Sequence, residues 1–395
     1  MSLIYLDNNA TTMVDPKVIE EMLPYFSEKY GNPSSIYDLA HSANNAVKKS
    51  REIMAEFLGA STPKEIIFTS CGSESATTAI KGTLEVLPSK KHIITTRVEH
   101  PCVLNLYKEY EKRGYKVDWV DVNEDGELSA QDVISKVTQD TALVSVMMAN
   151  NETGAIFPVE EIAQGAKEKN PDTKVFVDGV QGAGKIPINV KETKIDMLGV
   201  SAHKFHAPKG IGALYVKTGT TLPALIVGGH QERGKRAGTE NVPYIVGMAK
   251  AAELAMQNLD DELTRVKALR DKLENGILST IKNAKLNSRA KNRVPNTTNI
   301  GFEYIEGELI LLHLSDIGIC ASSGSACTSG SLEPSHVLRA QKVPFTSLHG
   351  SIRFSLSRFT TENEIDYALN ELPQIIQKIA KISPFQKELD EIFNR

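Results

Sequence analysis

Short apolar segments alternate with amphipathic segments between about residue 60 and residue 217. The apolar segments are rich in β-branched residues and too short for helices, as in His92–Thr96 (HIITT) and Lys174–Asp178 (KVFVD). The segments between them, such as Pro101–Arg113 and Val159–Lys169, have helical spacing of their apolar residues. This alternation predicts an α/β fold with a mostly parallel sheet that helices cover on both faces. The predicted strands are 65–70, 92–96, 116–122, 142–149, 174–178, 197–201 and 212–216.

The pattern changes after a long helical segment that runs from Pro243 to about Ile281. Strand and helix patterns then follow one another at 297–304, 307–314, 351–355 and 362–382. This texture predicts a smaller α+β domain, and the total of 395 residues fits two or three domains. We therefore expect a large domain of residues 15–260 and a small domain made of residues 1–14 and 261–395.

The charged residues exclude several classes of function. The 45 basic and 49 acidic residues are spread along the chain, so nothing marks a nucleic-acid or membrane-surface partner. No apolar run approaches the roughly 20 residues of a membrane span, and the N-terminal MSLIYLDNN is unlike a secretory signal. Four cysteines without a CxxC pair indicate neither a disulfide framework nor an intrinsic metal site. We expect a reducing, cytoplasmic setting.

A lysine lies at the end of one predicted strand. Ser201-Ala202-His203-Lys204 closes the strand at 197–201, and a Gly/Pro-containing turn follows it. A lysine at the carboxyl end of a central strand is partly desolvated, which lowers its pKa and frees the amine for covalent chemistry with a carbonyl cofactor. Alone, the four residues are weak evidence, because many strands end in polar surface residues.

Two other strand ends strengthen this interpretation. Asp178 ends the strand at 174–178, and a carboxylate there can keep the ring nitrogen of pyridoxal 5'-phosphate protonated. The segment Thr69–Ser75 (TSCGSES) joins a strand to a helical pattern, where backbone N–H groups and serine hydroxyls can hold a phosphate. One lysine, one aspartate and one phosphate cradle on the same sheet predict a pyridoxal phosphate site.

Cys327 lies in a Ser/Gly-rich segment, ASSGSACTSGS at 321–331, which is predicted to be a flexible loop. No apolar periodicity surrounds it, so an exposed and reactive thiol is favoured over a core residue. A nucleophile on a loop suits a reaction that collects an atom at one place and delivers it at another. By contrast Cys71, Cys102 and Cys320 adjoin apolar runs, and we expect them to be packing residues.

Three other classes of protein stay open on the residues alone. An aminotransferase or a selenocysteine lyase shares the lysine, the aspartate and the phosphate cradle, but does not need a cysteine on such a loop. A sulfur-trafficking scaffold without a cofactor needs Cys327 but has no use for Lys204. A redox protein needs a resolving cysteine near the first, and none lies near Cys327 in the sequence.

The motifs together resemble those of the NifS/IscS-type cysteine desulfurases, most closely the nitrogen-fixation NifS branch, which are fold-type I pyridoxal phosphate enzymes. The resemblance covers nearly the whole chain. It rests on 4–12 (IYLDNNATT), 31–35 (GNPSS), 98–101 (VEHP), 150–154 (NNETG), 201–204 (SAHK), 228–232 (GGHQE), 236–241 (RAGTEN), the Cys327 loop, 333–336 (EPSH) and 351–354 (SIRF).

This resemblance implies a role for each matching position at the cofactor ring. Lys204 is expected to bind the cofactor covalently, with Asp178 on the pyridine nitrogen and Gln181 on the ring hydroxyl. His100 is expected to stack on the ring and to assist proton transfer. Asn151 is expected to contact cofactor or substrate.

The resemblance also implies a phosphate site that two subunits share. Gly72, Ser73, Ser201 and His203 are expected to hold the phosphate. Thr239 is expected to reach it from the second subunit of a homodimer.

For the reaction, the resemblance implies that Arg353 binds the carboxylate of L-cysteine and that Cys327 takes its sulfur as a persulfide, leaving L-alanine. The expected acceptor is an iron–sulfur scaffold protein, with nitrogenase maturation as one destination, and the persulfide is expected to be able to ligate an iron–sulfur cluster transiently. The long loop fits the NifS/IscS group rather than the short-loop SufS-like group. One departure is Gly179, where the family leads us to expect alanine.

Overall fold

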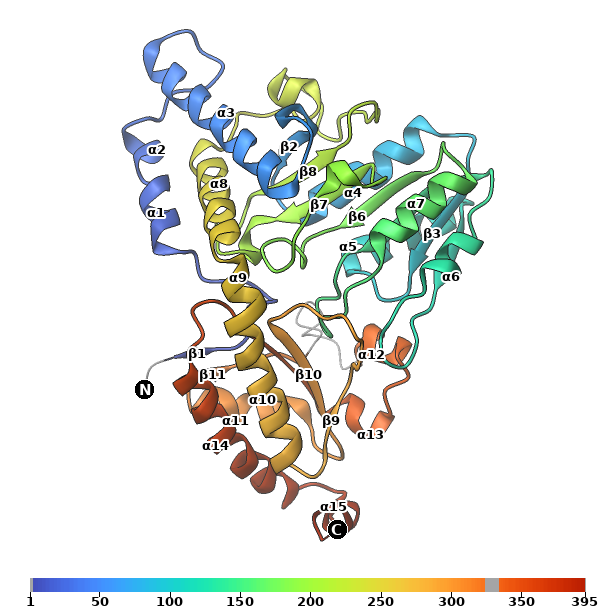
Figure 1. Cartoon of the computed structure of the whole chain (residues 1–395), viewed down its shortest axis with the longest axis vertical. Coiled ribbons are helices and arrows are strands. Elements are labelled where there is room, and N and C mark those ends of the chain that lie inside the picture. The colour runs from blue at the N-terminus through green and yellow to red at the C-terminus, as the bar shows by residue number, and fades with distance from the viewer. Residues whose placement is uncertain (1–2, 324–333, 395) are drawn as a thin grey trace.

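A seven-stranded sheet forms the centre of the larger lobe in the computed structural model, which describes residues 3–323 and 334–394 (Figure 1). The strand order is β2-β8-β7-β6-β5-β3-β4; β8 runs antiparallel to both its neighbours, and the other paired strands are parallel. The predicted mostly parallel sheet is thus confirmed. Its strands are β2 (Ile66–Thr69), β3 (His92–Thr96), β4 (Lys116–Val120), β5 (Thr141–Met147), β6 (Lys174–Asp178), β7 (Met197–Ser201) and β8 (Gly212–Val216).

Helices cover both faces of this sheet, because successive side chains of a strand point to opposite sides. In β6, Val175 and Val177 belong to one hydrophobic core and Phe176 belongs to the other. The first core is closed by α1 (Pro16–Met22), α3 (Asp38–Leu58), α6 (Ala130–Ser135), α7 (Val159–Lys169) and α8 (Val242–Gln257), and the second by α4 (Gly72–Val86) and α5 (Pro101–Lys112). The short α2 (Pro24–Ser27) follows α1.

The smaller lobe is built on a three-stranded antiparallel sheet of order β12-β10-β9. A two-stranded parallel sheet of β1 and β11 brings the N-terminal segment to this lobe, where Ile4 and Leu6 join its core. The elements are β1 (Ile4–Tyr5), β9 (Ala284–Leu286), β10 (Thr297–Phe302), α11 (Gly307–Asp316), β11 (Ile319–Cys320), α12 (His336–Ala340), α13 (Phe345–Leu348), β12 (Ser351–Ser355), α14 (Glu362–Ala380) and α15 (Gln386–Phe393).

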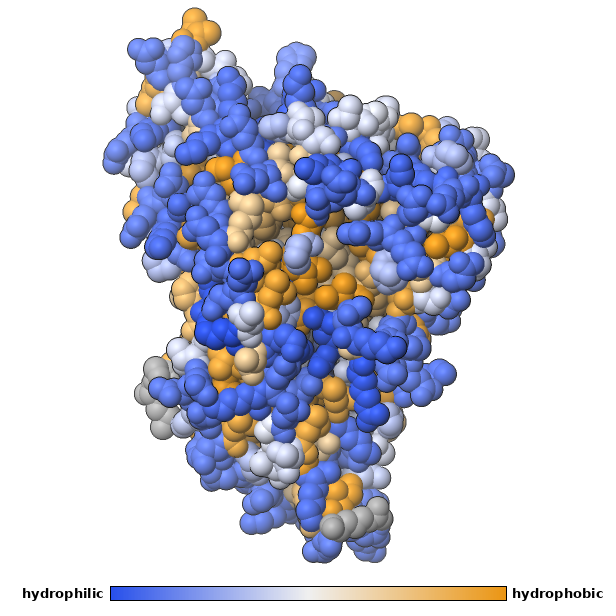
Figure 2. Space-filling view, in the orientation of Figure 1, coloured by the Kyte–Doolittle hydropathy of each residue, from blue (hydrophilic) through white to orange (hydrophobic). Residues whose placement is uncertain are grey.

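A nearly continuous helical path joins the lobes, as the sequence predicted. It runs from α8 through α9 (Leu259–Asp261) and a π turn (Glu262–Val266) into α10 (Lys267–Thr280) (Figure 1). The domain boundaries at residues 15 and 260 stay a prediction. On the face shown in Figure 2, hydrophilic residues cover most of both lobes, and hydrophobic residues gather at the waist between them. No helix within residues 3–323 and 334–394 is long and apolar enough to cross a membrane.

Candidate active site

A cavity of about 570 Å³ lies at the carboxyl edge of the large sheet. The residues that line it follow five strands: Gly72 after β2, His100 after β3, Asn151 after β5, Asp178 at the end of β6, and Ser201 at the end of β7. Parallel strands bring their carboxyl ends to one edge, which is where sheets of this kind bind ligands. The small lobe closes the cavity with Arg353.

Lys204 reaches this cavity from a single 3-10 turn, Ala202–Lys204, directly after β7. Its Nζ donates hydrogen bonds to the main-chain oxygens of Asn9, at 2.8 Å, and Ala10, at 2.7 Å. The amine is therefore held by the segment that leads from β1 into the large lobe. Both acceptors are uncharged main-chain oxygens.

Asp178 supplies a buried carboxylate to the same cavity, and its Oδ1 accepts a hydrogen bond from the Val180 N–H at 3.0 Å. Burial raises its pKa, while the nearby His100 and Lys204 act in the opposite direction. Among the described residues no arginine or lysine forms an ion pair with it. A buried carboxylate is stabilised by a cationic partner, so this position fits the protonated ring nitrogen of pyridoxal phosphate.

His100 caps the first turn of α5, and its Nδ1 accepts a hydrogen bond from the Cys102 N–H at 3.2 Å. The Cys102 Sγ lies 3.0 Å from the same nitrogen. Since Nδ1 acts as the acceptor, the ring proton of the neutral form lies on Nε2. Burial lowers the pKa of His100, with Asp178 opposing and Lys204 and His336 adding to the shift, so the ring is neutral near pH 7.

The start of α4 forms the predicted phosphate cradle. Gly72 and Ser73 begin the helix, and the first N–H groups of a helix have no intrahelical partners. A Cβ on Gly72 would lie 2.9 Å from the Val180 Cγ2 and 3.4 Å from the Ser201 Cβ, so only glycine allows the start of α4 to pack this closely against both residues. Burial lowers the pKa of His203 to about 4, with help from Lys204 and Lys209, and the ring is therefore a neutral hydrogen-bonding group.

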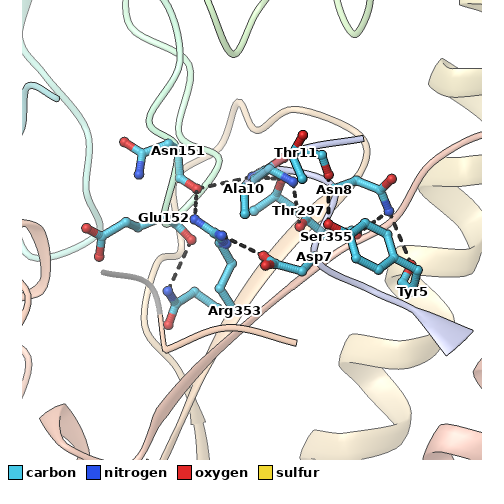
Figure 3. Close-up of polar contacts among 12 residues, drawn as sticks. Tyr5, Asp7, Asn8, Ala10, Thr11, Asn151, Glu152, Thr297, Arg353 and Ser355 are labelled. Carbon is cyan, nitrogen blue, oxygen red and sulfur yellow. Dashed lines mark hydrogen bonds and ion pairs between the residues drawn. The ribbon is translucent and has the colours of Figure 1, made fainter. Parts of the chain in front are cut away.

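Arg353 projects from β12 of the small lobe into the cavity and is only 2% exposed. Its Nη2 donates to the Asp7 Oδ1 at 2.7 Å, and its Nη1 donates to the main-chain oxygen of Asn151 at 3.0 Å (Figure 3). These two bonds fix the guanidinium plane between the N-terminal segment and the loop after β5. A planar group held in this way can present its other N–H donors to a carboxylate.

Eight further predicted residues fall into three groups. Asn151, Gln181, Ser201, His203, Gly72 and Ser73 line the same cavity as Lys204. Thr239 is exposed and does not line the cavity of its own chain. Cys327 lies outside the described residues. The segment that carries Thr239 is fixed by a bidentate ion pair between Arg51 and Glu232, at 2.6 and 2.7 Å.

The two ends of the segment that carries Cys327 lie beside the cavity. Ser322 exchanges main-chain hydrogen bonds with Arg353, at 2.7 and 3.2 Å. After the segment, Ser335 and His336 line the cavity. The Ser335 hydroxyl donates to the buried Glu152 carboxylate, and the His336 Nε2 lies 3.0 Å from the main-chain oxygen of Glu99.

The structure extends the expectation that Cys71 and Cys102 are packing residues. Cys102 does pack against the second hydrophobic core, and both cysteines also line the cavity. The apolar strands next to them suggested packing, but each cysteine follows its strand and therefore reaches the carboxyl edge of the sheet. Burial raises the pKa of the Cys102 thiol to about 12, so it is a poor nucleophile. Cys320 does not line the cavity.

The presence of glycine at position 179, where alanine was expected, has a local steric reason. A Cβ at this position would lie 2.8 Å from the Leu198 Cδ2 and 3.2 Å from the Gly199 oxygen. The leucine side chain fills the space that an alanine methyl group would need, while Asp178 and Gln181 still reach the cavity.

Sequence reasoning missed Asn9, Lys185 and Glu152 as site residues, although Asn9 and Glu152 lie in motifs that it used. Asn9 and Glu152 line the cavity, and Lys185 lies behind it against Gln181. No cluster of three or more His, Cys, Asp or Glu in the described part of the chain is arranged to hold a metal ion.

Comparisons with known proteins find relatives that match nearly the whole chain. The family model of class-V aminotransferases matches residues 4–368. A cysteine desulfurase of Trichormus azollae is 54% identical over 98% of this chain and 96% of its own length, and the cysteine desulfurase NifS of Azotobacter vinelandii is 51% identical over 98% and 95%. A solved structure of a NifS-like protein superimposes with a TM-score of 0.90 at 40% identity, covering 95% of this chain and all of its own.

Proposed function

The chain belongs to the class-V aminotransferase family, together with the cysteine desulfurases of the NifS type, and we propose that it removes sulfur from L-cysteine with pyridoxal phosphate. The products are L-alanine and a persulfide on Cys327. The observation that carries this proposal is the meeting of Lys204, Asp178 and Arg353 in one cavity. The first two suit a pyridoxal cofactor, and the third suits an amino-acid carboxylate.

The residues of the cavity divide the cofactor among them. Lys204 would hold it covalently through Nζ, which now donates hydrogen bonds to the main-chain oxygens of Asn9 and Ala10. Asp178 would pair with the ring nitrogen and Gln181 with the ring hydroxyl. Gly72, Ser73, Ser201 and His203 would hold the phosphate at the start of α4. The bound cofactor supplies an electron sink for the carbon next to the amino group.

The substrate is oriented by Arg353, whose guanidinium binds the carboxylate of cysteine. The Lys204 amine would be the base that takes the proton from the substrate Cα. His100 is neutral and carries its proton on Nε2, so it can donate that proton in the cavity and take it back. Glu152 accepts a hydrogen bond from the Ser335 hydroxyl and so fixes that residue at the wall of the cavity.

Cys327 acts on the substrate sulfur. Its thiolate forms a new S–S bond, the substrate C–S bond breaks, and the carbon keeps the bonding electrons and takes a proton, which leads to alanine.

The persulfide is the form in which sulfur leaves the enzyme. We propose that an iron–sulfur scaffold protein accepts it, with nitrogenase maturation as one destination. We also propose a homodimer, in which Thr239 of each chain completes the phosphate site of the other. The exposure of Thr239 and its absence from its own cavity support this arrangement.

The proposal is tested by assaying alanine and sulfide from L-cysteine with the purified, cofactor-loaded protein. Wild type should form both in equal amounts when a reducing thiol is present. An aminotransferase would form pyruvate-type keto acids and no sulfide, and that result would remove the desulfurase assignment.

A further inference from the structure

Lys185 is a lysine buried behind the cavity, not in it. Its side chain is 5% exposed, and it lies in the turn that follows β6. In this turn the Ala183 N–H donates to the Gly179 oxygen, and the Ile186 N–H donates to the Gly182 oxygen. Residues four apart therefore lie on the same side of the turn, which places Lys185 against Gln181.

The Lys185 amine makes two short hydrogen bonds to amide oxygens. Nζ donates to the Gln181 Oε1 at 2.6 Å and to the Asn9 Oδ1 at 2.8 Å. Neither acceptor is charged, so the lysine is not part of an ion pair in this cluster. Ordinary surface lysines keep the amine in water, and a buried amine that bonds only neutral amides needs a reason.

These bonds decide which way the Gln181 amide faces. A protonated lysine amine only donates, so the oxygen of Gln181 must lie on the Lys185 side and its NH₂ group on the other side. The Nε2 of Gln181 donates one hydrogen to the main-chain oxygen of Asn9 at 3.1 Å. Its second hydrogen is left for the cavity, which Gln181 lines. If the Gln181 amide were rotated by 180°, its oxygen would face the cavity and would accept a hydrogen bond instead of donating one.

Asn9 is fixed in the same manner. Its Oδ1 accepts from Lys185 and from the Asn296 Nδ2, at 3.2 Å, while its Nδ2 donates to the Thr297 Oγ1 at 2.8 Å and to the Asn151 oxygen at 3.1 Å. The main-chain oxygen of Asn9 is then the acceptor for both Gln181 and Lys204. Lys185 therefore contacts both Asn9, which binds the Lys204 amine, and Gln181, which lines the cavity.

We propose that Lys185 is a positioning residue, which orients the Gln181 amide so that it donates a hydrogen bond to the ring oxygen of the cofactor. The inference rests on the proposed function, since it concerns the same bound group. A donor at this oxygen stabilises its negative charge and so lowers the pH at which the bound cofactor loses its proton.

The ammonium form of Lys185 fixes the orientation of Gln181 more strictly than the neutral form does. Burial lowers its pKa to about 7, Lys204 and Arg353 add to the shift, and Glu262 opposes it. The other charged or titratable groups around the adjoining small cavity are His206 and Arg358. The ammonium has no lone pair, so in this form the Gln181 oxygen must face Lys185; the neutral amine also donates to that oxygen but no longer excludes the rotated amide.

The test follows the visible absorbance of the loaded enzyme as a function of pH. Lys185→Met keeps the length of the side chain and removes the donor, and the midpoint of the titration should rise by about one pH unit, the effect of losing one hydrogen bond to a charged oxygen. Gln181→Leu should raise it by at least as much. In the Gln181→Leu background, Lys185→Met should add nothing, because the lysine acts through the glutamine.

The matched control is Lys167→Met, which removes a partly buried lysine. Its partners are Asp196, at 2.7 Å, and the main-chain oxygen of Thr173, and not Gln181. Its midpoint should equal that of wild type. An unchanged midpoint in Lys185→Met, or the same shift with and without Gln181, overturns the inference. If Lys185→Met does not fold, Lys185→Gln replaces it in the same cycle, with at least half the shift expected because its shorter amide cannot reach both acceptors. A wild type without a cofactor absorbance band would instead overturn the proposed function.

Discussion

Arg353→Lys should weaken the binding of substrates that carry a carboxylate and leave other thiols unaffected. In the structure the guanidinium already donates to Asp7 at 2.7 Å and to Asn151 at 3.0 Å, and it has five N–H donors in a planar fork. A lysine at this buried position has one nitrogen, which Asp7 would hold. The substrate carboxylate would then lose its charge-assisted hydrogen bonds.

The loss of one such bond is about 1.5–3 kcal/mol, which corresponds to about 10- to 150-fold in affinity. The assay is the change of cofactor absorbance on titration with L-cysteine and with cysteamine, which lacks the carboxylate. Arg353→Lys should raise the dissociation constant for cysteine by that factor and change the constant for cysteamine little. The control is Arg358→Lys, since Arg358 is also buried and paired with Asp15 at 2.8 Å but does not line the main cavity. An equal loss for both ligands would refute the role given to Arg353.

Three further predictions follow from the same contacts. Lys204→Ala should abolish turnover while the phosphate contacts retain cofactor without a covalent bond, and borohydride treatment of wild type should label Lys204; labelling of another lysine would contradict the site. Burial lowers the pKa of His206 to about 3, so below about pH 6.5 the unfolded state binds more protons than the folded state. The free energy of unfolding should therefore fall on acidification by up to about 1.4 kcal/mol per pH unit. His206→Asn, which tolerates the φ of 69° at this position, should reduce that slope in urea denaturation between about pH 6.5 and 5. The protein should sediment as a dimer, and Thr239→Val should weaken cofactor binding by about tenfold or more; a monomer with full cofactor content and activity would rule out the shared phosphate site.

The sequence predicted the parts of the fold that repeat a simple pattern. The bounds of β3, β6, β7, β8 and α7 agree with the structure, because each is a buried run or an amphipathic face between clear turns. The 21-residue α3 was missed, although its buried residues recur at helical spacing from Ala40 to Leu58. The two-residue strands β1 and β11 pair residues more than 300 positions apart, and no local pattern predicts that.

The candidate site divides in the same way. Residues at strand ends, such as Asp178 and Lys204, were predictable because a parallel sheet brings those ends together. Lys185 was not, since a lone Gly-Lys-Ile reads as a surface turn, and its burial arises only when Asn9 folds over it. Cys71 and Cys102 were placed in the core because the strand next to each is apolar, but the direction of the chain after the strand carries both to the cavity.

The central claim is that Cys327 receives the sulfur of cysteine. The most direct measurement is a single turnover with one equivalent of L-cysteine and no reductant, followed by thiol alkylation, digestion and mass spectrometry. The account predicts one additional sulfur atom on the peptide that contains Cys327, with one alanine released per chain; Cys327→Ala should give neither product, and Cys320→Ala, which changes a thiol outside the cavity, should give both. Sulfur on Cys71, Cys102 or Cys320, or undiminished alanine release by Cys327→Ala, would contradict it.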